Sequence, residues 1–102
     1  NVTGVQTCAL PISYSDARLK TNVKTIENAV DTVSKMRGVT YDRDGKAGIG
    51  VIAQEIREIL PEVVVEGDDE NKTLSVAYGN IVGVLIEAIK ELKAEIDELK
   101  KK

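Results

Sequence analysis

Apolar positions in the last quarter of the chain alternate in steps of four and three residues. This spacing is that of heptad positions a and d of a coiled coil. We therefore predict one long helix over residues 78–102 whose apolar seam favours parallel self-association. The a positions are Val82, Ile89 and Ile96, and the d positions are Tyr78, Leu85, Leu92 and Leu99.

The width of this apolar stripe bears on the number of associated chains. β-branched residues at a with Leu at d favour two strands. Ile81, Ile86 and Ala88, however, extend the stripe into the flanking e and g positions. Either a third strand or docking of the helix on its own domain would cover these flanks. We predict a parallel homotrimer, with a surface helix packed on its own domain as the alternative.

Two shorter stretches also show helical spacing. Apolar residues recur every three or four positions over residues 26–36, and Gly38 follows as a natural helix stop. Residues 53–60 are likewise predicted to be helical, and Pro61 is expected to end that helix.

β-prone runs around turn residues predict hairpins between and after these helices. Residues 39–41 and 49–52 flank the turn dipeptide Asp44-Gly45. A second hairpin is expected where two β-prone runs, residues 63–65 and 74–76, flank the polar loop 67–72. The fold class is therefore α+β: short helices and one or two β-hairpins beside a long C-terminal coiled-coil helix.

Composition allows one domain with a modest core. The chain has 102 residues, three Tyr, and neither Phe nor Trp, and a domain of this size buries only about 60–65% of its unfolded surface. Association with further copies would add to that burial.

Charge and residue usage exclude several function classes. The net charge is −3, and no basic stripe interleaved with aromatics is present, which argues against nucleic-acid binding. With no His and one Cys, histidine-dependent nucleophiles, disulfide frameworks and Cys-rich metal sites are excluded. No apolar run is long enough to span a bilayer. We expect no cofactor, no metal and no membrane partner.

The first thirteen residues differ in composition from the rest. Every charged side chain lies after Ser13. Residues 1–13 resemble translated adapter read-through, so we predict that they are foreign or unstructured and that the domain spans residues 14–102.

One pair of residues at the start of this domain could carry chemistry. Ser15 and Lys20 place a hydroxyl and an amine five positions apart. Spacing alone is weak support, because Ser15 followed by Asp16 is also an ordinary start of a helix.

A second motif resembles a nucleotide-binding loop. Residues 48–53 read Gly-Ile-Gly-Val-Ile-Ala and fit the dinucleotide fingerprint, with Asp68 and Asp69 near the expected acidic position. Only about fifty residues follow, too few for that fold. We expect no nucleotide binding.

Three segments together resemble the peptidase family S74 intramolecular chaperone domain of phage tail spikes, tail fibres and endosialidases. They are Ser15-Asp16-Ala17-Arg18-Leu19-Lys20-Thr21-Asn22, Gly50-Val51-Ile52-Ala53-Gln54-Glu55, and the Leu/Ile-rich coiled-coil tail. The resemblance covers residues 15–102 and keeps the family's order of motifs.

This resemblance implies a C-terminal module that trimerises in the host cytoplasm, templates folding of an upstream shaft of its own polypeptide, and then cuts itself off the parent, which remains in the virion tail. Ser15 would be the nucleophile and Lys20 the general base of a self-cleaving serine endopeptidase acting in cis. The bond between Tyr14 and Ser15 would be cut. Asp16 and Asn22 are possible supporting residues.

Burial offers a physical reason for cleavage to wait for assembly. A lysine ammonium has an ordinary pKa near ~10.4 and becomes a useful base at neutral pH only when desolvation lowers that pKa. The alternative is a non-cleaving trimerisation tip of a tail fibre, in which Ser15 caps a turn and Lys20 is solvated.

Overall fold

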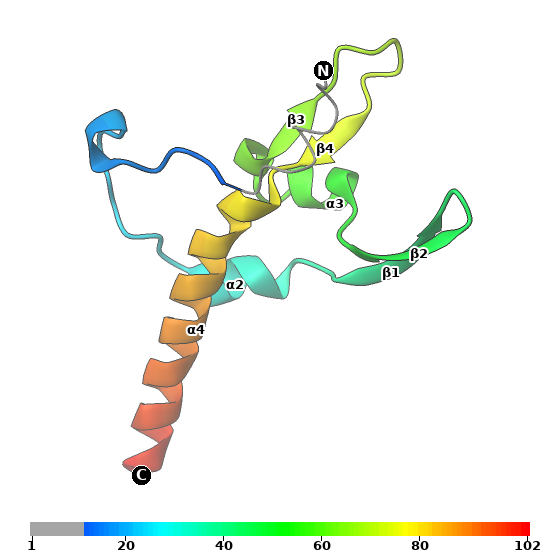
Figure 1. The fold of residues 1–102 in the computed structure, drawn as a ribbon. Helices are drawn as coiled ribbons and strands as arrows, with labels where there is room; N and C mark the ends of the chain where they lie inside the picture. The colour runs from blue at the N-terminus through cyan, green and yellow to red at the C-terminus, as the bar shows by residue number, and fades with distance from the viewer. Residues whose placement is uncertain (1–11) are drawn as a thin grey trace.

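The computed structural model describes residues 12–102 and has an α+β fold, as predicted. The prediction for residues 1–13 falls almost wholly outside this range. Two small antiparallel sheets of two strands each flank short helices, and one long helix ends the chain (Figure 1). The elements are η1 (Ala17–Leu19), α2 (Ala29–Ser34), β1 (Val39–Arg43), β2 (Lys46–Gly50), α3 (Ala53–Arg57), η2 (Pro61–Val63), β3 (Val64–Glu66), β4 (Leu74–Val76) and α4 (Tyr78–Lys100).

Both predicted hairpins are present. In the first, Tyr41 of β1 pairs with Gly48 of β2. Asp44 and Gly45 both have positive φ, 51° and 79°, as a two-residue type I′ turn requires. In the second hairpin, Val64 of β3 pairs with Val76 of β4. Local turn chemistry therefore sets the register of the first hairpin.

Both short helices differ from their predicted bounds. α2 begins at Ala29 instead of residue 26, because Asn28 takes a left-handed conformation with φ 56° and stops the helix from extending toward the N-terminus. α3 ends at Arg57, before Pro61, and Pro61 instead starts η2. Proline suits the first position of a helix because the backbone N–H at that position has no partner within the helix, so its absence from proline costs no hydrogen bond.

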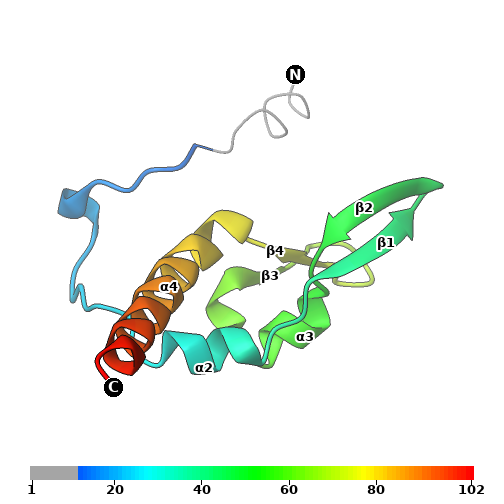
Figure 2. The ribbon, with the colours of Figure 1, turned by 90° about the horizontal axis from the view of Figure 1, so that it is seen from below.

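The core lies where α2, α3 and η2 surround the N-terminal half of α4 (Figure 2). One cluster joins Ala29 of α2 to Val84 and Ala88 of α4. The other joins Ile56, Val63 and Ile81, and Leu60 packs against both clusters. The flank residues Ile81 and Ala88 are thus covered by the chain's own domain, while Ile86 stays half exposed.

A glutamate from α4 caps the start of α2. Glu91 accepts the Ala29 N–H at Oε2 and the Val30 N–H at Oε1, both at 2.9 Å. Asn28 makes no side-chain cap bond. A helix of six residues is too short to be stable alone, so α2 depends on α4 both for its apolar contacts and for its N-terminal hydrogen bonds.

Replacing Glu91 with Gln should destabilise the fold and flatten its response to acid. The Val30 and Ala29 N–H groups lower the pKa of the Glu91 carboxyl. The resulting stabilisation is fully present above the unfolded pKa, roughly 4.3, and is lost as the pH falls through the lower folded value. A Gln side chain has only one acceptor oxygen, so it can accept only one of these two N–H groups.

Thermal melts of Glu91→Gln across the acid range are the measurement. We expect a lower Tm at neutral pH and a weaker fall of Tm below about pH 4.5. Glu95→Gln, one turn further along α4 and exposed, is the matched control. Equal acid profiles for the two variants would contradict the capping role.

Candidate functional site

The chain brings the predicted Ser15 and Lys20 side chains into contact. Lys20 Nζ donates to Ser15 Oγ at 2.6 Å. Five fully extended residues would span about 17 Å, so a turn between the two is required. η1 supplies this turn, with Lys20 N–H bonded to the Ala17 carbonyl oxygen at 3.1 Å.

Asp16 organises the turn through Arg18. Asp16 is the N-cap of η1, and its Oδ1 accepts the Arg18 backbone N–H at 2.8 Å. The Arg18 guanidinium also donates to Asp16, from Nε to Oδ1 at 3.1 Å and from Nη2 to Oδ2 at 2.8 Å. These bonds, the side-chain bonds first, lower the pKa of the Asp16 carboxyl. Arg18 was not among the predicted site residues, although an Arg close to an Asp in the sequence can bind both oxygens of its carboxylate.

The other predicted site residues lie outside this cluster. Tyr14 is 93% exposed and Ser15 is also exposed, so the bond between them is open to solvent in the single chain. Asn22 has a positive φ of 53°. None of the hydrogen bonds found in residues 12–102 joins Asn22 to Ser15 or Lys20, so its predicted supporting role stays a prediction.

Ser15 and Lys20 lie on an arm, residues 12–27, whose first part stands apart from the body, whereas Ile26 near its end lies beside Gly83 of α4. Figures 1 and 2 both show η1 projecting away from the helices and sheets. Ser15 and Lys20 are exposed, and no residue of η1 is buried. The desolvation expected to activate a lysine is therefore not provided by the body of the same chain.

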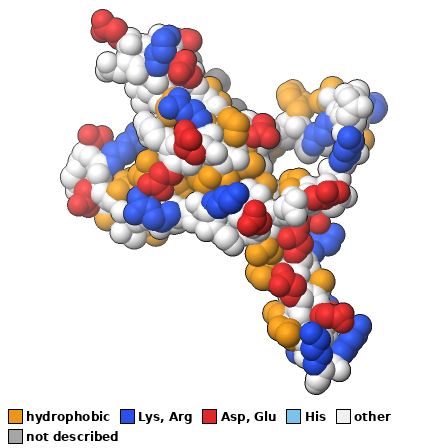
Figure 3. Space-filling model, turned by 180° about the vertical axis from the view of Figure 1, so that it is seen from behind, with side chains coloured by type: hydrophobic (Ala, Val, Ile, Leu, Met, Phe, Trp, Pro, Cys, Tyr) orange, Lys and Arg blue, Asp and Glu red, His pale blue; other side chains and the backbone are white. Residues whose placement is uncertain are grey.

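The predicted coiled-coil seam is a second exposed feature. Its residues from Val82 onward are 41–67% exposed: Val82, Leu85, Ile89, Leu92, Ile96 and Leu99. Figure 3 shows hydrophobic side chains gathered along one side of the protruding helix. Because α4 packs on its own domain through another face, that of Ile81, Val84 and Ala88, the seam stays open in the single chain.

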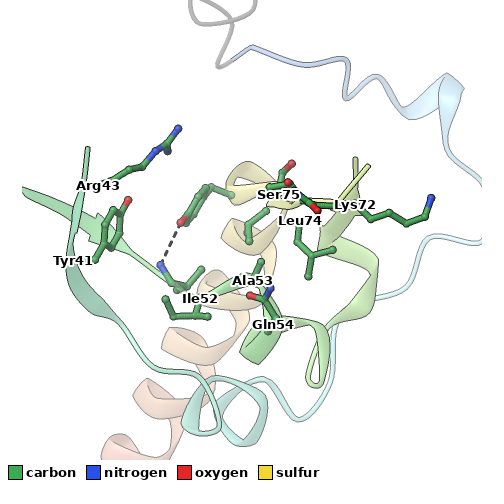
Figure 4. Close-up of a pocket in the computed structure, with 13 residues that line it drawn as sticks. Tyr41, Arg43, Ile52, Ala53, Gln54, Lys72, Leu74 and Ser75 are labelled. Atoms are coloured by element: carbon green, nitrogen blue, oxygen red, sulfur yellow. Dashed lines mark hydrogen bonds between the residues drawn. The ribbon is translucent and has the colours of Figure 1, made fainter. Parts of the chain in front are cut away.

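The first residue of the seam has an additional role within the domain. The Tyr78 hydroxyl accepts the Val51 N–H at 3.2 Å, the bond drawn dashed in Figure 4. Tyr78 lines a groove of about 920 Å³ together with Tyr41 and Arg43 of β1, Gln54 of α3, and Leu74 of β4. This groove separates the two hairpins.

The glycines of the nucleotide-like motif are explained by packing. Gly48 and Gly50 lie within β2, whereas a phosphate-binding loop needs them between strand and helix. A Cβ on Gly48 would lie 2.5 Å from Tyr41 Cε1, and one on Gly50 would lie 2.5 Å from the Tyr78 hydroxyl. The two glycines therefore make room for tyrosine rings.

Neither a metal centre nor a membrane span was identified in residues 12–102. These residues contain no group of three or more His, Cys, Asp or Glu side chains placed to hold an ion. No helix in this range is both long and apolar enough to cross a bilayer.

Comparison with known proteins finds a family match that begins at residue 15. The family model described as chaperone of endosialidase, Peptidase_S74, matches residues 15–65. The long tail fiber protein Gp37 of Enterobacteria phage K3 is 42% identical over 97 residues, an alignment covering 86% of this chain and 8% of that relative.

Two further Gp37 proteins show the same similarity. That of Enterobacteria phage T2 is also 42% identical, over 86% of this chain and 7% of its own length. That of Enterobacteria phage M1 is 36% identical, over 84% of this chain and 38% of its own length. The chain thus spans well under half of the length of these relatives.

Proposed function

Because the chain belongs to the chaperone-of-endosialidase family, Peptidase_S74, we propose that it is an intramolecular chaperone that trimerises and releases itself from a phage tail fibre by autoproteolysis. Its client is the upstream shaft of its own polypeptide. The similarity to Gp37 long tail fiber proteins supports a tail-fibre parent. Assembly takes place in the host cytoplasm, and the parent becomes part of the virion tail.

The contact between Lys20 Nζ and Ser15 Oγ at 2.6 Å is the observation that carries the proposed cleavage. The family match begins at Ser15 itself, as expected if this residue is the first of the released domain. Residues 14–102 form the chaperone domain in this proposal, with Tyr14 contributing the carbonyl group that is attacked.

Cleavage follows from the proximity of the reacting groups. With the Lys20 amine neutral, it takes the proton of Ser15 Oγ, and the oxygen attacks the Tyr14 carbonyl carbon. The C–N bond to Ser15 breaks, and its nitrogen receives the proton from Lys20. Water then hydrolyses the ester on Oγ, which leaves a Tyr14 carboxylate and a free Ser15 amine. Alignment within one chain removes the cost of bringing the reactants together.

Trimerisation would supply the desolvation that the single chain lacks. The open seam of α4 and the projecting arm are both exposed apolar surfaces, with Leu19 and Val23 on the arm. Association through the seam would bring three arms to one end of the bundle. Burial there favours the neutral form of a lysine, so cutting would follow assembly.

A non-cleaving trimerisation tip is the alternative, and the exposure of Ser15 and Lys20 in the single chain favours it. In that case the Ser15 hydroxyl is only a surface hydrogen-bond acceptor, and the parent fibre keeps the domain.

Intact mass spectrometry distinguishes these functions. The protein is expressed behind a fibre shaft as parent, as Ser15→Ala and as Lys20→Ala. We expect the parent to split between Tyr14 and Ser15 and both variants to remain whole, with residual cleavage reduced by at least about 10³-fold. Ser13→Ala is the matched control and should cut normally. Trimeric but uncut parent would establish the structural tip instead.

A further inference from the structure

A carboxylate lies next to Ser15 in the sequence but is not bonded to Lys20. Asp16 is the N-cap of the η1 turn and Lys20 is its C-cap. Within residues 12–102 no ion pair joins them, because Lys20 contacts Ser15 and both Asp16 oxygens bond to Arg18. Arg18 thus occupies the carboxylate that would otherwise compete for Lys20.

This competition would matter for the proposed chemistry. A carboxylate close to an amine stabilises the protonated form and so reduces the fraction of neutral base. An ion pair with Asp16 would also draw the Lys20 side chain away from Ser15 Oγ. A side-chain oxygen at position 16 is nevertheless needed, since Asp16 Oδ1 caps the turn by accepting the Arg18 N–H.

We propose that Arg18 is a positioning residue that holds both carboxylate oxygens of Asp16, fixes the η1 turn, and keeps Lys20 free for Ser15. This inference rests on the proposed function of the Ser15–Lys20 pair. Arg18 contacts neither reacting side chain through any hydrogen bond found in residues 12–102, so it acts only through Asp16.

The chemistry of arginine suits this role. Its planar guanidinium presents two parallel donors to a carboxylate, whereas a lysine ammonium acts as a point charge and cannot match that geometry. η1 projects from the body in Figures 1 and 2, so no packed element faces the pair. The other charged groups of the arm, Lys24 and Glu27, take part in no ion pair found in residues 12–102.

The test compares Arg18→Gln with the double variant Asp16→Asn/Arg18→Gln. Asn remains a good capping residue, so the double variant keeps the turn but removes the competing charge. Cleavage rates of the shaft-bearing protein are measured by intact mass across roughly pH 6–11. We expect Arg18→Gln to cut about tenfold more slowly at neutral pH, with its pH profile displaced upward by about one unit.

The double variant should have the pH profile of the parent. The profile of Arg18→Lys should lie between those of the parent and Arg18→Gln. If both variants are slow with an unshifted profile, Arg18 merely stiffens the turn and the positioning role is overturned. Parental rates in Arg18→Gln would overturn it as well. In both cases cleavage by the parent still supports the proposed function.

A second measurement does not depend on cleavage. In the uncut Ser15→Ala chain at neutral pH, NMR should show the Lys20 ammonium hydrogen-bonded to the Asp16 carboxylate once Arg18→Gln is added. This bond should be lost when Asp16→Asn is also added. Absence of the bond in the Arg18→Gln chain overturns the inference, whether or not the parent cuts.

Discussion

Replacing Ile89 and Leu92 with Asp is expected to abolish both self-association and self-cleavage. These residues are a and d positions of the exposed seam, 66% and 46% exposed in the single chain. In a parallel coiled coil each of these two side chains would pack into a hole formed by side chains of a neighbouring helix. Six carboxylates would then be buried at the centre of a trimer, at a cost that such a short coil cannot offset.

The fold of each chain should survive this double substitution. α4 contacts its own domain through Ile81, Val84 and Ala88, on another face of the helix. Circular dichroism should therefore still report a folded chain, while sedimentation shows a monomer and intact mass shows an uncut parent. The matched control is Lys90→Asp/Ala94→Asp, which adds two Asp residues outside the a and d positions and should remain trimeric and cut.

The result separates two models of activation. A folded monomer that still cuts would show that the arm alone activates Lys20, and the proposed dependence on assembly would be wrong. A trimer that persists despite both Asp residues would show that another surface drives association.

Replacing Ile56 with Ala is expected to cost about 2–5 kcal/mol of unfolding free energy, because deletion of a buried aliphatic group leaves a cavity. Ile56 is 0% exposed and is the one large side chain in residues 12–102 that is fully buried. It packs with Val63 and Ile81, so it joins α3 and η2 to α4. The total unfolding free energy of a small domain is about 5–15 kcal/mol.

Urea denaturation at fixed protein concentration is the measurement, since association would otherwise contribute. Ile49→Ala, at a position 81% exposed on β2, is the matched control and should change stability by less than about 0.5 kcal/mol. Similar losses for both isoleucines would show that the first hairpin is buried by another chain.

Local signals explain which elements were predictable. The Asp44-Gly45 turn needs two positive φ values that this dipeptide tolerates, so the first hairpin followed directly from the sequence. The apolar repeat along residues 78–102 likewise predicted α4, because helical periodicity depends only on residue spacing.

The bounds of the short helices were less predictable. Ile26 is part of a helical apolar pattern but precedes Asn28, whose left-handed conformation starts α2 late. The hydrogen bonds at the start of α2 come from Glu91, which is 62 residues from Ala29 and 61 from Val30 in the sequence. Sequence periodicity contains no information about such a long-range cap.

By itself, the sequence determined the α+β class, both hairpins, the long helix with its heptad seam, and the spacing of Ser15 and Lys20. Each of these depends on neighbouring residues. Only the tertiary structure decided that α4 packs through Ile81 and Ala88 and leaves the seam open, and that Arg18 takes the Asp16 carboxylate. These outcomes are choices among competing partners, which depend on distances in three dimensions and not on the order of residues along the chain.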